Sequence, residues 1–597
     1  MSPQFNAHSR HEGFLPIEAY GVVGDGRTIA LSGSDGSIDW WCVPNMDSPP
    51  LFDRILDPVD GGFFKVEPAE AFTVERRYRP DSNVLETEFR TADGLARLTE
   101  SLNSGSAGRL PWEELARRVE GIEGSVTFRV HFRPGRQADK VSPYLGESGR
   151  QRVFHVGNVL GVFLGSAGLV IDEEGDAGLR GHLTVERGDR ELVAIVAGQD
   201  EPLVVPGIDE IDKRIDVADD EWKHWSSTVR FEGEDRPLLI RHALALKLLL
   251  YSPTGAIAAA GTTSLPEWIG GDRNFDYRYA WVRDAGYTIK AFLRIGAEAE
   301  AKAAFTWLLN RLRDTDGDLF YRLDGGNPAE VETIDVPGYR GSQPVVIGNQ
   351  ATHQHQHGVY GDILETAGQF VAGGNILDAV SAGVLSRLAD QCADSWRRKD
   401  AGIWELSTPQ HYTMSKISAW QALARAVELT DGGHLPTTCR DRWARERDRI
   451  ADWVEEHCWS MEKDAFVMYP GSNQLDASLA LAVRFGFDGK ERLRRTLAAI
   501  ERELGEGQFH FRYSDARGVE GCFLACTFWI AEAWHVLGDE ERANTSMRGA
   551  LAALSGGPGT LAEMVDPVSH AWLGNVPQGL SHLAVVHALI TLSGARR

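Results

Sequence analysis

The sequence predicts a two-part chain, with an antiparallel β-sandwich over residues 1–225 followed by an (α/α)6 barrel over residues 226–597. Three observations lead to this prediction. The chain has 597 residues, which is more than one hydrophobic core usually organises. Its first part alternates apolar and polar residues between closely spaced turns. Its second part carries apolar residues at helical spacing.

The predicted sandwich rests on strands that alternate with period two and on the turns between them. Clear alternation occurs at residues 62–67, 125–132 and 191–197. Gly and Asp pairs that favour tight turns occur at residues 24–26, 35–36 and 93–94. The Gly-rich run at 21–26 lacks the strand–GxGxxG–helix context and the lysine of a phosphate-binding loop. We therefore expect a sandwich of many strands in this part, with no nucleotide site.

Helical periods begin near residue 236 and recur to the end of the chain. Helical segments are expected to start near residues 236, 283, 298, 350, 374, 412, 437, 474, 487, 521, 539 and 578. Twelve helices arranged as six hairpins would close into an (α/α)6 barrel. Long Gly/Pro-rich connections at 251–275, 324–348, 505–520 and 555–577 separate some of them. Connections of this length in a compact domain usually carry function.

Charge and composition exclude several classes of partner. The net charge is −24 and the isoelectric point is about 5.2, so nucleic acid and anionic membranes are unfavourable partners. The sequence contains no run of 18 apolar residues, so no transmembrane helix is predicted. The segment Met1 to Gly13 lacks the apolar core of a signal peptide. Six cysteines in so long a chain do not form a disulfide framework. A reducing, cytoplasmic setting is expected, and the composition is compatible with a homo-oligomer.

Two glutamates stand in settings that suit acid–base chemistry. Glu405 follows Trp404, and a carboxyl against an aromatic wall is poorly solvated, which raises its pKa. Glu563 follows the Gly/Pro-rich loop 555–560, where a more polar setting would let it stay ionised. Such a pair can cleave a glycosidic bond, because one group protonates the leaving oxygen while the other activates water.

The segment from Glu267 to Asp284 is dense in aromatic, Arg and Asp residues. A sugar needs a flat apolar face to stack on, together with planar donors and acceptors for its hydroxyl groups. Arg283 and Asp284 at a helix start could hold two adjacent hydroxyls. They could equally form a salt-bridged cap, with Asp284 near the positive end of the helix dipole. The segment alone leaves both interpretations open.

Four motifs, taken together, resemble glycoside hydrolase family 15, which contains glucoamylases, glucodextranases and some bacterial and archaeal trehalases. Residues 20–40 are similar to the start of the β-domain that precedes the barrel in prokaryotic members. Residues 273–285 match the family signature, residues 403–405 its acid motif, and residues 563–582 its base motif. The motifs occur in the family's order and span almost the whole chain.

The resemblance implies a role for each matching residue. Glu405 would be the general acid and Glu563 the general base of an inverting, exo-acting hydrolase. The remaining matches would bind the non-reducing glucose in a closed pocket, namely Tyr277, Trp281, Arg283, Asp284 and Trp404. An inverting mechanism would require the two carboxyls to stand ~6.5–9.5 Å apart, with room for a water molecule.

The chain departs from the family pattern around the proposed base. Ala562 stands where relatives often carry Ser, Met564 where they often carry Glu or Gln, and Leu580 where an aromatic residue is frequent. Leu406 and Ser407 replace the Val-Arg or acidic residues that follow the acid in many relatives. These changes leave the substrate linkage open among trehalose, isomalto- and malto-oligosaccharides.

No cofactor or metal site is predicted. His353, His355 and His357 could suggest a metal, and two of them would share a helix face, but no carboxylate completes a HExxH-type site. A hydrogen-bonding cluster at the cleft is favoured. Cys522 and Cys526 are predicted to be buried core thiols on a helix. Calcium occurs in some relatives' β-domains, but no diagnostic oxygen-ligand loop is present here.

We therefore expect a hydrolase that releases β-glucose from the non-reducing end of a short α-glucoside. Its partner would be a small carbohydrate. Two alternatives stay open at this point. One is a catalytically silent carbohydrate-binding protein that has kept the pocket, and the other is an inverting phosphorylase or transferase on the same barrel.

Overall fold

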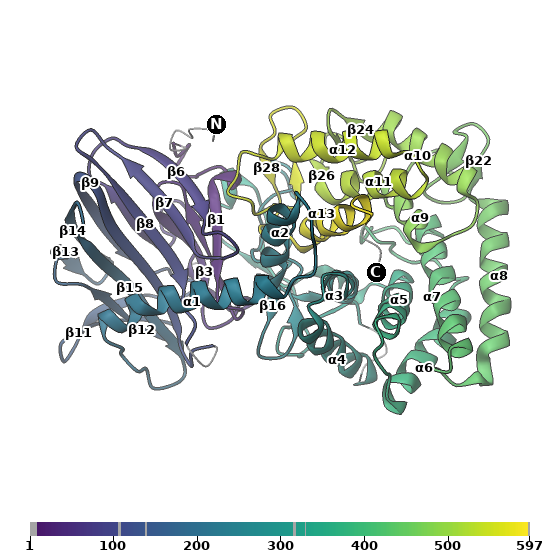
Figure 1. The fold of residues 1–597 in the computed structure, drawn as a ribbon, viewed down its shortest axis with the longest axis horizontal. Helices are drawn as coiled ribbons and strands as arrows, with labels where there is room; N and C mark the ends of the chain where they lie inside the picture. The colour runs from purple at the N-terminus through teal and green to yellow at the C-terminus, as the bar shows by residue number, and fades with distance from the viewer. Residues whose placement is uncertain (1–8, 106–108, 138–139, 315–317, 329, 595–597) are drawn as a thin grey trace.

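The computed structural model describes residues 9–105, 109–137, 140–314, 318–328 and 330–594. A β-rich part and a helical part lie side by side, as Figure 1 shows, which confirms the predicted fold class. Most of the polar N-terminal segment Met1 to Gly13 lies outside the described residues. Within the described residues no helix is both long and apolar enough to cross a membrane.

The β-rich part consists of two antiparallel layers that share one long strand, β9 (Glu113–Arg133). One layer contains β1 (Tyr20–Gly24), β2 (Ile29–Gly33), β3 (Ser37–Cys42), β4 (Pro50–Phe52), β5 (Phe63–Pro68), β13 (Val170–Gly175) and β14 (Gly178–Glu186). The other contains β6 (Thr73–Tyr78), β7 (Leu85–Arg90), β8 (Gly94–Leu102), β10 (Tyr144–Ser148), β11 (Gln151–Val156), β12 (Val159–Gly165) and β15 (Arg190–Gln199). The first half of β9 pairs with β8 and β15, and the second half pairs with β14 and β5. Apolar residues of both layers, such as Phe64 and Phe89, fill the space between them.

A helix that the sequence did not lead us to expect joins the two parts. α1 (Ile208–Thr228) packs on β8, β9 and β15, and the predicted domain boundary at residue 225 falls inside it. Ile211, Ile215 and Trp222 form its buried stripe. Acidic and basic residues separate these apolar positions, so the segment has the composition of a solvated connection. The helix becomes evident only once a sheet covers its one apolar face.

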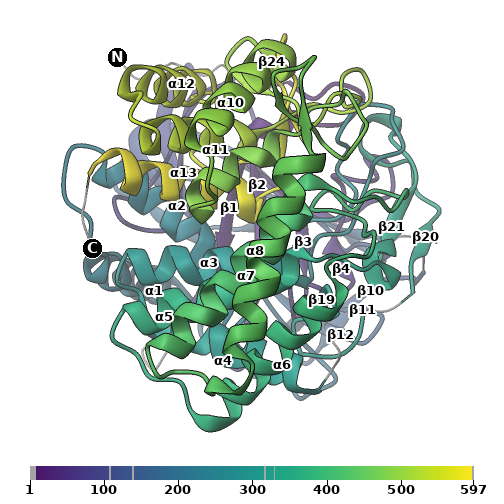
Figure 2. The ribbon, with the colours of Figure 1, turned by 90° about the vertical axis from the view of Figure 1, so that its right-hand side faces the viewer.

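The helical part is a closed double ring. Its inner ring consists of α3 (Val282–Arg294), α5 (Gly358–Ala372), α7 (Thr413–Asp431), α9 (Leu481–Phe485), α11 (Leu524–Val536) and α13 (Gly579–Leu592), each in contact with the next, and α13 touches α3 again. The outer ring consists of α2 (Arg236–Leu249), α4 (Glu298–Asp314), α6 (Ala379–Ser395), α8 (Arg440–His457), α10 (Lys490–Leu504) and α12 (Glu540–Ala553). Figure 2 shows this ring from the side opposite the β-rich part. All twelve predicted helical segments are present, although the one near residue 474 is only the 3-10 turn Ala477–Ala480 followed by the short α9.

Each inner helix begins after a connection from the preceding outer helix, and these connections carry short strands. The strands are β16 (Leu250–Tyr251), β17 (Ala256–Ile257), β18 (Ala280–Trp281), β19 (Phe320–Tyr321), β20 (Glu332–Ile334), β21 (Val345–Ile347), β22 (Trp459–Ser460), β23 (Ala465–Phe466), β24 (Gly505–Glu506), β25 (Phe509–His510), β26 (Cys522–Phe523), β27 (Met564–Val565) and β28 (Trp572–Leu573). Because the inner helices form one ring, their N-terminal ends and these connections meet at one mouth of the barrel.

The β-rich part supports this mouth directly. Trp40 of β3 is fully buried, and its indole N–H donates to the carbonyl oxygen of Gly261 across 3.0 Å. Arg278 donates to the carbonyl oxygen of Ser48 across 2.9 Å and forms a buried ion pair with Asp276. One hydrophobic core runs through both parts. The sandwich therefore holds the connection that leads into α3.

Candidate active site

A small cavity opens at this mouth. It is lined by Ala259, Tyr277, Arg283, Asp284, Ile403, Trp404, Glu405, Arg512, Phe523, Glu563, Gln578 and Leu580. These residues come from the connections that precede α3, α7, α11 and α13 and from the first turns of α3 and α13. Six of the seven predicted site residues line the cavity, although they lie up to 286 positions apart in the chain (Tyr277 to Glu563).

Arg283 and Asp284 lie in the first turn of α3 and are joined by an ion pair of 2.9 Å. Arg283 also donates to the carbonyl oxygen of Ile403 across 2.8 Å. The Asp284 Oδ1 atom is buried without a hydrogen-bond partner in the described residues. The pair is therefore salt-bridged at a helix start, as one of the two interpretations predicts, and it also lines the cavity, where the other would place it. The unpaired oxygen can accept a ligand hydroxyl.

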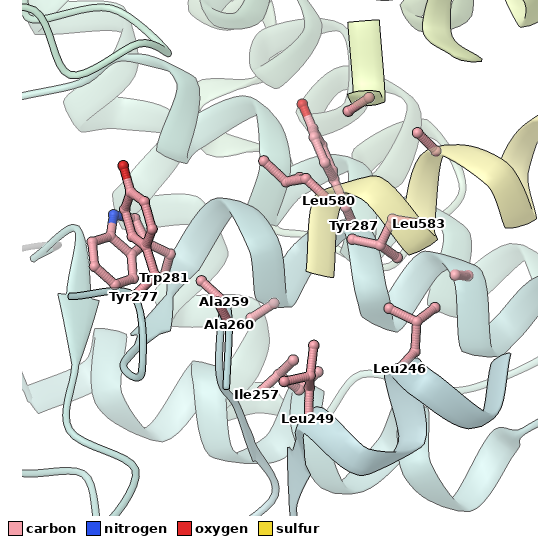
Figure 3. Close-up of a cluster of buried hydrophobic side chains, with 14 of the residues drawn as sticks. Leu246, Leu249, Ile257, Ala259, Ala260, Tyr277, Trp281, Tyr287, Leu580 and Leu583 are labelled. Atoms are coloured by element: carbon pink, nitrogen blue, oxygen red, sulfur yellow. The ribbon is translucent and has the colours of Figure 1, made fainter. Parts of the chain in front are cut away.

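Tyr277 and Trp281 form an aromatic wall. Their ring centroids are 5.2 Å apart and nearly perpendicular, and Figure 3 shows the two rings side by side, with Ala259 close by. Burial, followed by the charges of Glu405 and Glu563, raises the pKa of Tyr277 well above its usual value. The Tyr277 hydroxyl therefore stays neutral and lies within the field of both carboxyls. Trp281 does not line the cavity itself, but stacks on Phe320 at 4.3 Å behind it.

Glu405 occupies a strained turn between α6 and α7. Its φ of 58° lies in the left-handed region that a Cβ disfavours, a strain that is common at functional sites. Gly402, with φ of 70°, lets the turn approach the Tyr412 ring, because a Cβ there would come within 2.8 Å of that ring. Burial raises the pKa of Glu405, while the Arg283 guanidinium 3.6 Å away opposes the rise. The predicted raised pKa of the acid is confirmed in direction.

Trp404 is held rigidly beside this acid. Its indole N–H donates to Asp476 Oδ1 across 2.8 Å, and its ring stacks on Trp529 at 6.2 Å. The Phe523 ring meets it edge-on at 5.6 Å. A flat indole fixed on three sides is a suitable surface for a sugar ring.

Glu563 precedes the first residue of β27, in a three-stranded sheet that also contains β26 and β28. Its main-chain carbonyl accepts from Leu524 N at the start of α11, and the backbone N–H of Asn575 donates to its Oε2 across 3.4 Å. Gly574, with φ of 73°, packs so closely that a Cβ there would stand 2.7 Å from this oxygen. The carboxyl is thus fixed from both sides.

The expectation that Glu563 sits in a polar loop is wrong. Its exposed fraction is 2%, and burial raises its pKa to about 7, with the Arg512 charge and the Asn575 N–H opposing the rise. Sequence composition describes only the residues that flank Glu563 along the chain. The apolar enclosure comes from β26, β28 and α13, which only the fold places against Glu563.

Arg512 is a cavity residue that sequence reasoning missed. Its guanidinium donates to Glu520 through Nε (2.6 Å) and Nη2 (2.5 Å), and Nη2 also donates to Glu267 Oε2 (2.8 Å). It lies 5.5 Å from the centre of the Trp404 ring. Within the described residues its Nη1 has neither a hydrogen-bond partner nor full burial. The surrounding sequence, residues 505–520, was recognisable as a functional loop by its length alone.

The residues that differ from the family pattern take no polar role in the cavity. Ala562 and Met564 are fully buried on either side of Glu563, and Leu580 contributes an apolar wall. The Glu563 carboxylate accepts from the Asn575 N–H, and the Arg512 charge and this N–H favour its ionised form. The Ala562 carbonyl accepts from the Ser581 hydroxyl across 2.8 Å.

The histidine cluster forms no metal site among the described residues. The predicted shared helix face is wrong, because α5 begins only at Gly358 and the three histidines precede it. His357 is buried and pairs with Asp400 at 3.3 Å, whereas His353 and His355 are exposed. Cys522 and Cys526 are buried and free, as predicted, although Cys522 lies in β26 rather than on a helix.

Two buried carboxyls and an ion pair line one cavity at the mouth of an (α/α) barrel, an arrangement that is compatible with hydrolysis of a glycoside. The family model described as "Glycosyl hydrolases family 15" matches residues 233–553, and that described as "Trehalase-like, N-terminal" matches residues 10–174. The chain belongs to glycosyl hydrolase family 15, as its motifs led us to expect.

Relatives agree with this membership, and a solved structure agrees with the fold. A protein named trehalase from Thermoplasma volcanium is 31% identical over 605 residues, covering 98% of this chain and 94% of that protein. A protein named trehalase from Mycobacterium tuberculosis is 31% identical over 616 residues, covering 97% and 89%. A bacterial glucoamylase solved with acarbose superposes with a TM-score of 0.71 at 12% identity, covering 99% of this chain and 97% of that one, which supports the fold.

Proposed function

We propose that this chain hydrolyses trehalose with inversion at the cleaved anomeric carbon. The observation that carries the proposal is the convergence of Glu405 and Glu563 on one cavity that is also lined by the Arg283–Asp284 pair. The choice of trehalose draws on the relatives named trehalase, which resemble this chain over nearly its whole length.

In the proposed mechanism Glu405 is protonated and gives its proton to the glycosidic oxygen as the bond breaks. Burial shifts the pKa of Glu405 upward, the direction that favours the protonated form this role requires. Glu563 in its ionised form takes a proton from a water molecule, which attacks the anomeric carbon from the opposite face. The Arg283–Asp284 pair would hold the hydroxyls of the glucose being cleaved, and Tyr277 would face its developing positive charge. A carboxyl separation of ~6.5–9.5 Å is a requirement of this scheme.

The remaining parts of the proposal concern partners and location. A small carbohydrate is the only partner that the mechanism needs. The free cysteines, most of them buried, fit a reducing compartment, and we place the enzyme in the cytoplasm.

The test is product analysis on trehalose, isomaltose and maltose, with proton NMR of the first-formed anomers. From trehalose, inversion gives equal amounts of β-glucose, from the attacked ring, and α-glucose, from the leaving ring. From trehalose, α-glucose alone would exclude inversion. Phosphate-dependent release of glucose 1-phosphate would instead identify a phosphorylase.

Substitutions then test the two roles. Glu405→Gln and Glu563→Gln should each lower kcat by ~10²–10⁴-fold, the usual contribution of a general acid or base. Glu446→Gln is the control, since Glu446 is a buried, ion-paired carboxylate on the outer helix α8. Unchanged turnover in both site variants would refute the assignments, and a wild type that binds these sugars without turnover would indicate a binding protein.

A further inference from the structure

A third buried carboxyl, Glu267, lies beside the proposed base and takes no part in the mechanism above. Its exposed fraction is 1%. Its main chain ties two connections together, because its N–H donates to the Arg273 carbonyl (3.1 Å) and its carbonyl accepts from Gly521 N (2.8 Å). Its side chain accepts from Arg512 through Oε2, whereas Oε1 is buried without a partner in the described residues.

Charged and titratable side chains from several connections lie around Glu267. Arg512, Tyr513 and Glu520 come from the connection before α11, Arg273 and Tyr277 from the connection before α3, and Glu563 from the residue before β27. Glu520 is fully buried and forms ion pairs with both Arg512 and Arg273, so it is the paired anion of this group. Two arginines are therefore present, and Glu520 already matches the charge of one of them.

With two arginines and the anion Glu520, the cluster is neutral only if it contains one further anion. Leaving a net charge in a buried cluster is costly, since each unpaired buried ion loses its hydration. If Glu563 is ionised, as a general base must be, it matches the second arginine and the cluster is neutral. Ionising Glu267 as well would leave an unmatched negative charge behind the cavity.

Burial and the neighbouring charges indicate which of the two carboxyls keeps the proton. Glu563 accepts from the Asn575 N–H and lies in the field of Arg512, and both favour its ionised form. At Glu267 the Oε2 atom forms an ion pair of 2.8 Å with Arg512, which favours ionisation, whereas Oε1 has no partner in the described residues. Burial nevertheless raises the pKa of Glu267 well above its usual value; the Arg512 charge opposes the rise, and the charges of Glu520 and Glu563 add to it.

We propose that Glu267 is a positioning residue that keeps its proton during turnover and holds Arg512 as a neutral acceptor, so that Glu563, and not Glu267, carries the second negative charge of this cluster. This inference rests on the proposed role of Glu563. It assigns to three carboxyls around one arginine three different states: Glu520 is the paired anion, Glu563 the reactive anion, and Glu267 the neutral acid.

The experiment compares the acid limb of the pH profile of kcat/KM in the wild type, Glu267→Gln and Glu520→Gln. Replacing the anion Glu520 leaves Arg512 unmatched, so the apparent pKa of Glu563 should fall by about 1 unit or more. Replacing a neutral Glu267 by the equally neutral Gln should move this pKa by less than ~0.3 units, well below the ~1 unit that a charge change brings. A fall in Glu267→Gln as large as in Glu520→Gln would show that Glu267 is an anion and overturn the proposal.

The positioning role has its own variant. Glu267→Ala removes the acceptor of Arg512 Nη2 and should lower kcat/KM about tenfold, roughly the value of one hydrogen bond. Glu267→Gln, which restores an acceptor oxygen, should recover most of that loss. Equal activity in the wild type and Glu267→Ala would refute the positioning role.

Infrared spectroscopy provides a readout that does not depend on turnover. At pH 8 the wild type minus Glu267→Gln difference spectrum should contain the carbonyl stretch of a protonated carboxyl. A carboxylate band in its place would overturn the proposal. Because this measurement does not use Glu520→Gln, it tests the proposal even if that variant does not fold. If the wild type cleaves none of the sugars, the proposed function fails while this spectrum still tests the protonation state of Glu267.

Discussion

At the scale of single residues, the site combines two carboxyls that are both poorly solvated. In the proposed mechanism Glu405 donates a proton, and burial shifts its pKa in the direction that this role requires. The proposed base Glu563 must be ionised, yet its burial works against ionisation, while the Arg512 charge and the Asn575 N–H favour it. A desolvated anion is a stronger base than a hydrated one, so the same burial that disfavours ionisation makes the ionised carboxylate more reactive.

This arrangement predicts the acid limb of the activity profile. The pKa of Glu563 is raised to about 7 in the free protein, and the base is active only when ionised. We therefore expect kcat/KM to fall tenfold per pH unit below a midpoint near pH 7. Arg512→Gln removes the largest opposing charge and should move the midpoint upward. A midpoint near pH 4.5, the ordinary value of a glutamate, would contradict this prediction.

The same carboxyl should make the protein less stable at alkaline pH. Its pKa is higher in the folded chain (about 7) than in the unfolded chain (4.5), so stability falls as pH rises between these values. The full penalty, about 3 kcal/mol, is present above pH 7 and absent below pH 4.5. Glu563→Gln should thus raise the Tm at pH 8 and leave it unchanged at pH 4. Urea or thermal unfolding at both pH values measures this, and an equal effect at both would exclude the buried charge as the cause.

At the scale of elements, the connections before the inner helices carry the site, while the helices carry the core. Sequence periodicity is sufficient to locate helices such as α7 and α13, because their buried stripes recur every three to four residues. The β27–β28 hairpin is different. Each of these strands has only two residues, which is too few to show a periodic pattern in the sequence. They form a sheet only because β26 lies beside them.

Gly574 in this hairpin gives a prediction at the same scale. Gly574→Ala forces a Cβ to 2.6 Å from the Glu563 Cβ, so we expect kcat to fall at least tenfold and stability to fall by ~2 kcal/mol or more. Gly486→Ala is a matched control, since Gly486 has φ of 76° at the end of α9 and its Cβ would meet nothing within 4 Å. The control carries the backbone strain without the clash, and equal kcat values in the two variants would show that the contact does not position the base.

At the scale of the whole molecule, the β-rich part is a structural support for the barrel mouth. Trp40 and Arg278 link the two parts directly behind the connection that carries Tyr277. One hydrophobic core passes through both parts. The two parts are therefore expected to unfold together rather than as independent domains.

Trp40→Phe tests this support. It leaves the Gly261 carbonyl buried without its donor, which costs about 1–3 kcal/mol, and it should also lower kcat/KM because the adjoining connection loosens. Trp112→Phe is the control, since the Trp112 indole donates to Glu114 within the β-rich part. Thermal unfolding and kinetics on the proposed substrate separate the effects. If Trp40→Phe lowers the stability but leaves kcat/KM unchanged, the Trp40–Gly261 hydrogen bond does not influence the site.

The sequence by itself determined the two-part architecture and the barrel helices, because periodicity is a local property of the chain. Its short motifs also indicated Glu405, Glu563, Arg283 and Asp284 as candidate site residues, and the fold brings these four to one cavity. It did not reveal α1, whose single apolar face has meaning only against a sheet. It also misjudged the setting of Glu563 and missed Arg512 and the protonation role proposed for Glu267. Those properties depend on burial and on charges brought together from connections hundreds of residues apart, and only the tertiary structure decides which groups share one low-dielectric site.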